Sequence, residues 1–182
     1  MKITPTEIPD VLIIEPRVLG DALGYFFEAW RANLFTEAGV TATFVQDNQS
    51  SSSQGVLRGL HYQIQQPQGK LVRVIAGRVF DVAVDIRRSS PTFGRWVGSE
   101  LSEENRRSLW VPPGFAHGFY VLSDRAEFIY KCTDYYAPQH ERVISFDDPD
   151  IGIDWPLIPG VQTNLSDKDR GGVAFRDADC FD

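Results

Sequence analysis

The sequence predicts a mainly β protein, built as an antiparallel sandwich or barrel. Three observations support this fold class. The apolar runs are short, rich in β-branched and aromatic residues, and separated by Gly, Pro, Ser and Asp, as in proteins made of many short strands. Aromatic residues make up 12% of the chain, which favours strands and stacking surfaces. Helix signals are few, so the helices that a doubly wound α/β fold needs between its strands are missing.

Eight segments are predicted to be strands. The longest is 79–86, a nearly continuous apolar run, and the segment 70–75 ends at Gly77. The other predicted strands are 11–14, 43–46, 108–111, 118–122, 127–132 and 142–146. The polar segment 50–55, with four consecutive serines, is predicted to be a loop before a strand.

Two short helices are expected. The first covers Asn33 to Ala38 and is closed by Gly39. The second is opened by a capping box over 166–169. With 182 residues, the chain suits a single domain, and 42% hydrophobic residues provide a core without disulfides. We expect an N-terminal arm over about 1–50, a barrel core over about 51–147 and a C-terminal segment over about 148–182.

Charge and cysteine content narrow the function classes. The net charge of -7 argues against a nucleic-acid partner, because such proteins usually carry basic faces. The sequence has no signal-peptide core and no apolar stretch of about 18 residues, so we expect no membrane association. Cys132 and Cys180 are too few for a secreted disulfide framework, which favours a cytoplasmic protein with reduced thiols.

Polar and charged residues gather around one of the three histidines. Arg58, His61, Lys70 and Arg73 lie within 16 residues, beside apolar strands. Burying such groups is costly unless they line a cavity. Arg58 and His61 are three residues apart, so a regular strand would point them to opposite faces. Gly59 between them would permit a bulge that brings both to one cavity.

The segment 112–117, with the pattern P-x-G-x-x-H, resembles the second signature of the cupin superfamily of small β-barrels. Metal-binding cupins add an H-x-H pair and a glutamate in their first signature. Here the matching positions are His61, Tyr62 and Gln63, so the second histidine is absent. Divalent metal sites usually need three or four protein ligands. We therefore expect no metal, and His61 is available for proton transfer, although a metal-dependent cupin such as a dioxygenase is a rival interpretation.

Over nearly the whole chain the sequence resembles the dTDP-4-dehydrorhamnose 3,5-epimerases. The resemblance is carried by eleven strings in a fixed order, each weak by itself. They are 8–16, 24–28, 44–48, 56–61, 69–73, 80–87, 90–94, 113–119, 130–131, 135–136 and 165–169.

The resemblance implies a dimeric cupin-fold enzyme with no metal or organic cofactor, acting on dTDP-4-dehydro-6-deoxy-D-glucose. It implies that His61 is the general base, that Asp169 orients His61, that Tyr130 is the general acid and that Lys70 lies at the C4 oxygen. This set suits the chemistry. Epimerisation next to a ketone needs a base on one face, a cation at the oxygen where charge develops, and an acid on the other face.

The resemblance also implies a substrate-binding set. Arg58 and His117 would hold the diphosphate or the sugar, and Tyr136 would stack on the thymine. The remaining residues expected to line the nucleotide and sugar site are Gln46, Asn48, Glu28, Glu141 and Lys168.

One position departs from the family pattern. Family members usually read G-D-x-R-G-x-F-F-E, and this chain has Leu23 in the arginine position. A charge-assisted phosphate contact contributes roughly 1.5–3 kcal/mol, so nucleotide affinity or identity is affected while the proton-transfer set is intact.

Simpler interpretations exist for each residue taken singly. A lone histidine is more often structural than catalytic, Tyr130 would suit a core aromatic, and Asp169 would suit a helix cap. It is much less plausible that all of these simpler interpretations are correct at once, given that the residues occur in this order. Two further rivals are an epimerase acting at C3 or C5 only, on a related dTDP-4-keto-6-deoxy sugar, and a sugar-nucleotide binder without activity.

Overall fold

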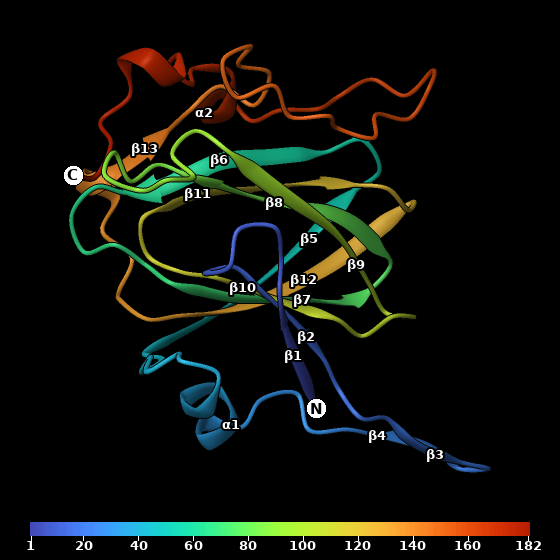
Figure 1. The fold of residues 1–182 in the computed structure, drawn as a ribbon. Coiled ribbons are helices and arrows are strands. Elements are labelled where there is room, and N and C mark those ends of the chain that lie inside the picture. The colour runs from blue at the N-terminus through green and yellow to red at the C-terminus, as the bar shows by residue number, and fades with distance from the viewer.

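Two antiparallel sheets form the body of the molecule, and the computed structural model describes residues 1–182 (Figure 1). One sheet has six strands in the order β1-β2-β10-β7-β12-β5, and the other has five in the order β13-β6-β11-β8-β9. The bounds are β1 Lys2–Pro5, β2 Leu12–Glu15, β5 Gln46–Ser53, β6 Leu57–Gln63, β7 Lys70–Ala76, β8 Arg78–Asp85, β9 Trp96–Ser102, β10 Ser108–Val111, β11 Phe115–Val121, β12 Arg125–Cys132 and β13 Glu141–Val143. The mainly β prediction is confirmed, and the arrangement is consistent with a jelly roll.

Apolar side chains from both sheets meet between them and form the inner core. Val72, Leu109 and Phe128 come from the six-stranded sheet, and Val79 and Phe119 from the five-stranded sheet. This core fills one part of the space between the sheets. The rest of that space is lined by polar side chains and becomes the cavity described below.

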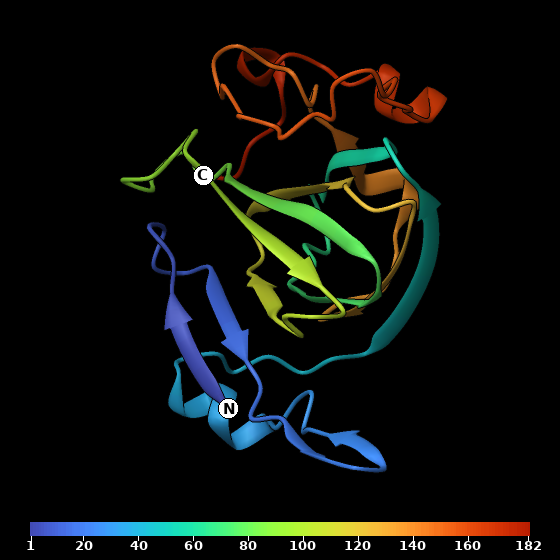
Figure 2. The same cartoon turned by 90° about the vertical axis from the view of Figure 1, so that its right-hand side faces the viewer.

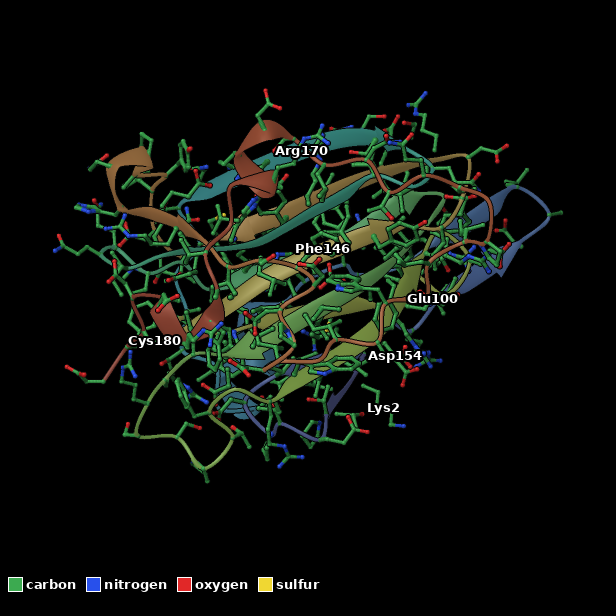
Figure 3. All side chains as sticks on the ribbon, turned by 90° about the horizontal axis from the view of Figure 1, so that it is seen from above. Lys2, Glu100, Phe146, Asp154, Arg170 and Cys180 are labelled. Carbon is green, nitrogen blue, oxygen red and sulfur yellow. The ribbon has the colours of Figure 1, made fainter.

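The C-terminal segment covers the outer face of the five-stranded sheet (Figures 1 and 2). Seen from above, it passes over the strands with Phe146, Asp154 and Arg170 along its course (Figure 3). Trp155 packs in a second apolar cluster with Val82 and Val84 of β8. Both faces of β8 are therefore buried, which explains why its sequence is almost continuously apolar instead of alternating.

Strands β1 and β2 of the N-terminal arm belong to the six-stranded sheet, and the rest of the arm, residues 16–45, lies below it on the side away from the C-terminal segment (Figure 2). Helix α1, Ala32–Glu37, packs Phe35 against Leu12, Leu71 and Trp110 of that sheet. The short hairpin β3, Leu19–Asp21, and β4, Gly24–Phe26, projects away from the barrel (Figure 1).

Both predicted helices are present. Helix α1 lies within one residue of the expected bounds. Helix α2, Asp167–Arg170, is capped by the Ser166 side chain, which accepts a hydrogen bond from the Asp169 backbone N–H, as the capping box predicts. The remaining helical turns are the 3-10 helices η1, Pro138–His140, and η2, Phe175–Asp177. None of these helices has the length and hydrophobicity of a membrane-spanning helix.

The serine-rich segment corrects a prediction. Residues 50–53 are not a loop, and residues 43–45 are not a strand. Strand β5 begins at Gln46 and runs through the serines to Ser53. It pairs with β12 along its whole length, from Gln46 opposite Cys132 to Ser53 opposite Arg125. Ladder hydrogen bonds to a neighbour distant in sequence thus override the weak strand propensity of serine. Strands β1, β3, β4 and β9 were also missed, and no bounds were predicted for β6. Strand β9 completes the edge of the five-stranded sheet. The strand predicted over 118–122 begins earlier, at Phe115, and the one predicted over 142–146 ends at Val143.

Candidate active site

A cavity of about 360 Å³ opens between the two sheets. Ten of the twelve site residues expected from the sequence line it. They are Gln46, Asn48, Arg58, His61, Lys70, His117, Tyr130, Tyr136, Glu141 and Lys168. Gln46 and Asn48 come from β5, Lys70 from β7 and Tyr130 from β12, whereas Arg58 and His61 come from β6 and His117 from β11. Polar side chains from both sheets therefore face one another across the cavity.

A bulge in β6 turns Arg58 and His61 to the same side. His61 pairs with His117 and Arg58 pairs with Phe119, so two residues of β6 lie opposite the single residue Gly118. Gly59 has a φ of +120°, and a Cβ there would lie 2.6 Å from the carbonyl oxygen of His117. The bulge expected from the sequence is confirmed, and it needs glycine because the neighbouring strand is too close for a side chain.

His61 and Asp169 form a close pair at the wall of the cavity. His61 Nε2 lies 2.5 Å from Asp169 Oδ1. The same oxygen accepts a hydrogen bond from the Gly59 backbone N–H at 3.3 Å, and the other carboxylate oxygen accepts one from the Ser166 hydroxyl at 2.6 Å. The carboxylate is 2% exposed and the imidazole 22% exposed. Asp169 is thus fixed from three sides, and His61 is held at Nε2 while its other ring nitrogen, Nδ1, remains available to take a proton.

The environment sets the protonation state of this pair. Burial by itself would raise the pKa of Asp169, but hydrogen bonds from His61 and Ser166 outweigh it and hold the pKa at about 2. Burial lowers the pKa of His61, aided by the charge of Lys168, and the bond to Asp169 offsets only part of this effect. At neutral pH the carboxylate is therefore ionised and the imidazole is neutral, which is the form a general base requires.

Lys70 and Tyr130 project from the opposite sheet. Burial lowers the pKa of Lys70, while the nearby carboxylates of Glu141 and Asp81 oppose that shift. Burial raises the pKa of Tyr130, so its phenol stays protonated at neutral pH and can donate a proton. His61 and Tyr130, the expected base and the expected acid, therefore come from different sheets and lie on opposite walls of the cavity.

His117 and Arg58, which also line the cavity, form hydrogen bonds with residues outside the cavity lining. His117 Nε2 lies 2.9 Å from one carboxylate oxygen of Asp81 and 3.0 Å from the other, and Asp81 is fully buried. Burial raises the pKa of Asp81, and His117 opposes that shift. Arg58 Nε donates to the Ser52 hydroxyl at 3.1 Å. Arg58 and His117, which are expected to bind the diphosphate or sugar, are thus oriented by Ser52 and Asp81 in the walls of the cavity.

The rim of the cavity carries a small polar network. Glu141 accepts a hydrogen bond from Lys168 Nζ at 2.9 Å and another from the Tyr136 hydroxyl at 3.1 Å. Burial alone would raise the pKa of Glu141, but Lys168 and His61 outweigh it and lower the pKa. The Tyr136 ring remains about half exposed beside the opening.

The structure does not bring Glu28 to this cavity. It lies on the N-terminal arm and pairs with Arg31 at 3.2 Å. Within a single chain Glu28 does not reach the cavity, so its assignment to the site remains a prediction.

Several residues that shape the site could not be assigned to it from the sequence. Phe119 and Phe128 stack with ring centroids 4.4 Å apart and form the apolar wall of the cavity. Asp81 orients His117, and Ser166 orients Asp169. Asp81 left a visible signal, because an aspartate inside a continuous apolar run is buried and needs a partner.

The chain holds no group of three or more His, Cys, Asp or Glu side chains placed to bind a metal ion. The position of the second histidine in the cupin pattern is occupied by Gln63, whose side chain bonds to backbone groups instead.

Comparison with known proteins agrees with this geometry. The profile of the family described as dTDP-4-dehydrorhamnose 3,5-epimerase matches residues 5–177. This chain belongs to that family. A dTDP-4-dehydrorhamnose 3,5-epimerase of Pseudomonas aeruginosa is 62% identical over 182 residues, covering 100% of this chain and 99% of that protein.

Solved structures of the family extend the comparison. The dTDP-6-deoxy-D-glucose-3,5-epimerase of Legionella pneumophila, in complex with dTDP-4-keto-L-rhamnose, superposes with a TM-score of 0.94 at 56% identity, covering 98% of this chain and 94% of that one. A more distant relative is a 3'-monoepimerase of Streptomyces bikiniensis in complex with dTDP-quinovose. Its TM-score is 0.87 at 34% identity, covering 94% of this chain and 87% of that one. The proteins that this chain resembles therefore include ones described as a 3,5-epimerase and as a 3'-monoepimerase.

Proposed function

We propose that this protein is a dTDP-4-dehydrorhamnose 3,5-epimerase, which converts dTDP-4-dehydro-6-deoxy-D-glucose to dTDP-4-dehydro-L-rhamnose by inverting C3 and C5. The observation that carries the proposal is the placement of His61, backed by Asp169, across a single cavity from Lys70 and Tyr130. The close relatives described by this activity support it.

In the proposed mechanism His61 takes the proton from the carbon next to the C4 ketone. The electrons move into the carbonyl, and Lys70 stabilises the negative charge that develops on the oxygen. Asp169 stabilises the imidazolium that forms, as in other His–Asp pairs. Tyr130 then delivers a proton from the opposite face, which inverts the centre. The reaction changes no oxidation state, so side chains can supply every proton transfer and no cofactor is required.

Substrate binding is assigned to the rest of the cavity. Arg58 and His117 would hold the diphosphate or the sugar, while Tyr136 would stack on the thymine and Gln46, Asn48, Glu141 and Lys168 would line the site. Leu23 takes the place of a family arginine and is 96% exposed. We expect it to weaken nucleotide binding without altering the proton-transfer residues.

We also propose that the protein is a homodimer. The arm hairpin exposes Leu19, Leu23, Tyr25 and Phe26 to a degree unusual for large apolar side chains. Burial of this hairpin against a second copy would remove the exposed surface, and it would give Glu28 a route to the cavity of that copy. Two free cysteines, Cys132 and Cys180, support a location in a reducing compartment such as the cytoplasm.

The first test is mass spectrometry of dTDP-4-dehydro-6-deoxy-D-glucose after incubation with the enzyme in D2O. Two deuterium atoms in the sugar are expected, one each at C3 and C5. One deuterium would favour the single-site alternative, and none with folded protein would refute the activity. The variant His61→Ala should lose turnover yet bind dTDP within a few fold of the unaltered protein, and normal turnover in that variant would refute the base assignment.

A further inference from the structure

The loop that carries Tyr136 has almost no regular structure of its own. Residues 133–137, called here the Tyr136 loop, connect the end of β12 to η1. An irregular backbone must find hydrogen-bond partners outside a helix or ladder. In this loop, backbone groups of the four residues 134–137 form hydrogen bonds with the side chains of three glutamines.

Gln63 makes the largest contribution. Its side-chain oxygen accepts a hydrogen bond from the Ala137 backbone N–H at 2.8 Å. Its Nε2 donates to the backbone oxygens of Tyr135 at 3.2 Å and Gln66 at 2.7 Å. Gln63 is 4% exposed, and it lies on the same strand as His61, two residues further along. A rigid strand that presents the base therefore also holds the loop on both sides of Tyr136.

Gln46 and Gln68 complete the contacts. The Tyr136 backbone N–H donates to Gln46 Oε1 at 3.0 Å, and Gln68 Nε2 donates to the Asp134 backbone oxygen at 2.8 Å. We call Gln46, Gln63 and Gln68 the glutamine clamp. A carboxamide is suited to this work because one side chain both donates and accepts, whereas a carboxylate of the same shape can only accept.

The Tyr136 ring has little packing to orient it. It is 53% exposed, and its only side-chain hydrogen bond is the one from its hydroxyl to Glu141. A half-exposed ring on a free loop would lose conformational freedom when it stacks on a ligand, and that loss opposes binding. A loop fixed through its backbone removes most of this cost before the ligand arrives.

We infer that the glutamine clamp is a positioning device that holds Tyr136 ready for a planar nucleobase, with Gln63 as its central member. The inference rests on the proposed function for the identity of that base, the thymine of dTDP. Gln63 acts through Tyr136 and takes no part in proton transfer. Its loss therefore lowers nucleotide affinity and leaves the chemical step intact.

The test is a double-mutant cycle on dTDP binding, measured by calorimetry. Gln63→Glu keeps the shape and the bond from Ala137 but replaces two donated hydrogen bonds by contacts between oxygens. We expect dTDP to bind about tenfold more weakly, with kcat at saturating substrate within about twofold. In a Tyr136→Ala background, which itself weakens binding, the same change should have no further effect, because there is no ring left to position.

Results that overturn the clamp inference can be distinguished from results that refute the proposed function. An equal loss with and without Tyr136, or no loss in Gln63→Glu alone, would overturn the inference. Unchanged dTDP affinity in Tyr136→Ala would overturn the stacking assignment and the clamp's role with it. Failure to epimerise the sugar would refute the proposed function only, because the cycle measures dTDP binding. Should Gln63→Glu not fold, Gln68→Ala removes a single bond to the same loop and is expected to show the same dependence on Tyr136.

A matched control is available on β5. Gln49 also bonds through its side-chain amide, to Glu127 at 3.2 Å, but it is exposed and pairs with Ile129, four residues before the loop begins. Gln49→Ala should bind dTDP like the unaltered protein. A loss comparable to that of Gln63→Glu would show that the weaker binding does not depend on contact with the Tyr136 loop, and the inference would fall.

Discussion

Asp169→Asn tests the role of the carboxylate behind the base. The substitution removes one negative charge and leaves the shape of the side chain unchanged. The surroundings also fix how the amide would sit. His61 Nε2 and the Gly59 backbone N–H both point at Oδ1, so the amide oxygen must occupy that place. The amide nitrogen then takes the place of Oδ2, where it can donate to the Ser166 hydroxyl oxygen. The histidine keeps its tautomer and position, so the variant isolates the effect of charge.

The magnitude follows from that geometry. The bond between His61 and Asp169 is short, and the carboxylate is 2% exposed. A hydrogen bond to a buried charged group contributes roughly 1.5–3 kcal/mol, which corresponds to a loss of about 10- to 150-fold in kcat. A serine protease that loses its aspartate in the same way slows about 10⁴-fold because the histidine takes the wrong tautomer. The smaller loss is expected here because the tautomer is retained.

The pH profile gives a second readout. The hydrogen bond and the charge of Asp169 both raise the pKa of His61, against the larger lowering caused by burial. Removing the charge therefore lowers this pKa further. The base is active when neutral, so activity rises with pH through the His61 pKa, and the acid limb of kcat/KM should move to lower pH in Asp169→Asn.

The assay is the rate of deuterium incorporation from D2O across pH 4–8, with dTDP affinity measured in parallel. Asp167→Asn is the matched control, because Asp167 lies in the same helix but is fully exposed. It should behave like the unaltered protein. Wild-type kcat in Asp169→Asn, or an acid limb displaced to higher pH, would refute the reasoning.

Three other predictions follow from the same site. Tyr130→Phe removes the proton donor on the opposite face. It should retain exchange of the sugar proton with D2O but yield little inverted product by NMR, and full inversion would exclude Tyr130 as the acid. Leu23→Arg restores the cation that the resemblance to the family leads us to expect at this position of the arm. It should tighten dTDP binding by roughly 10- to 100-fold in a salt-dependent way, and unchanged affinity at low salt would contradict this. Gly118→Ala would put a Cβ 2.7 Å from the Arg58 backbone oxygen. It should destabilise the protein by about 1–3 kcal/mol, seen as a Tm lower by several degrees in circular dichroism, and an unchanged Tm would show that the bulge tolerates a side chain.

Much of the secondary structure of this protein can be predicted from local sequence patterns. Strands such as β7, β8 and β12 follow from short apolar runs bounded by turn residues, and α2 follows from its capping box. The bulge at Gly59 could be expected from the spacing of two polar residues around a glycine. These features are decided by steric and hydrogen-bonding preferences of adjacent residues, which a sequence displays directly.

Tertiary structure decided the features that depend on distant partners. The serines of β5 became a strand only because β12 supplies the ladder. Gln63 gives no local sign that it holds a loop 72 residues away in the sequence. The orientation of His61 by Asp169 spans 108 residues and requires α2 to dock beside β6. Hydrogen bonds and desolvation act through space, so their partners are chosen by the fold and not by neighbours along the chain.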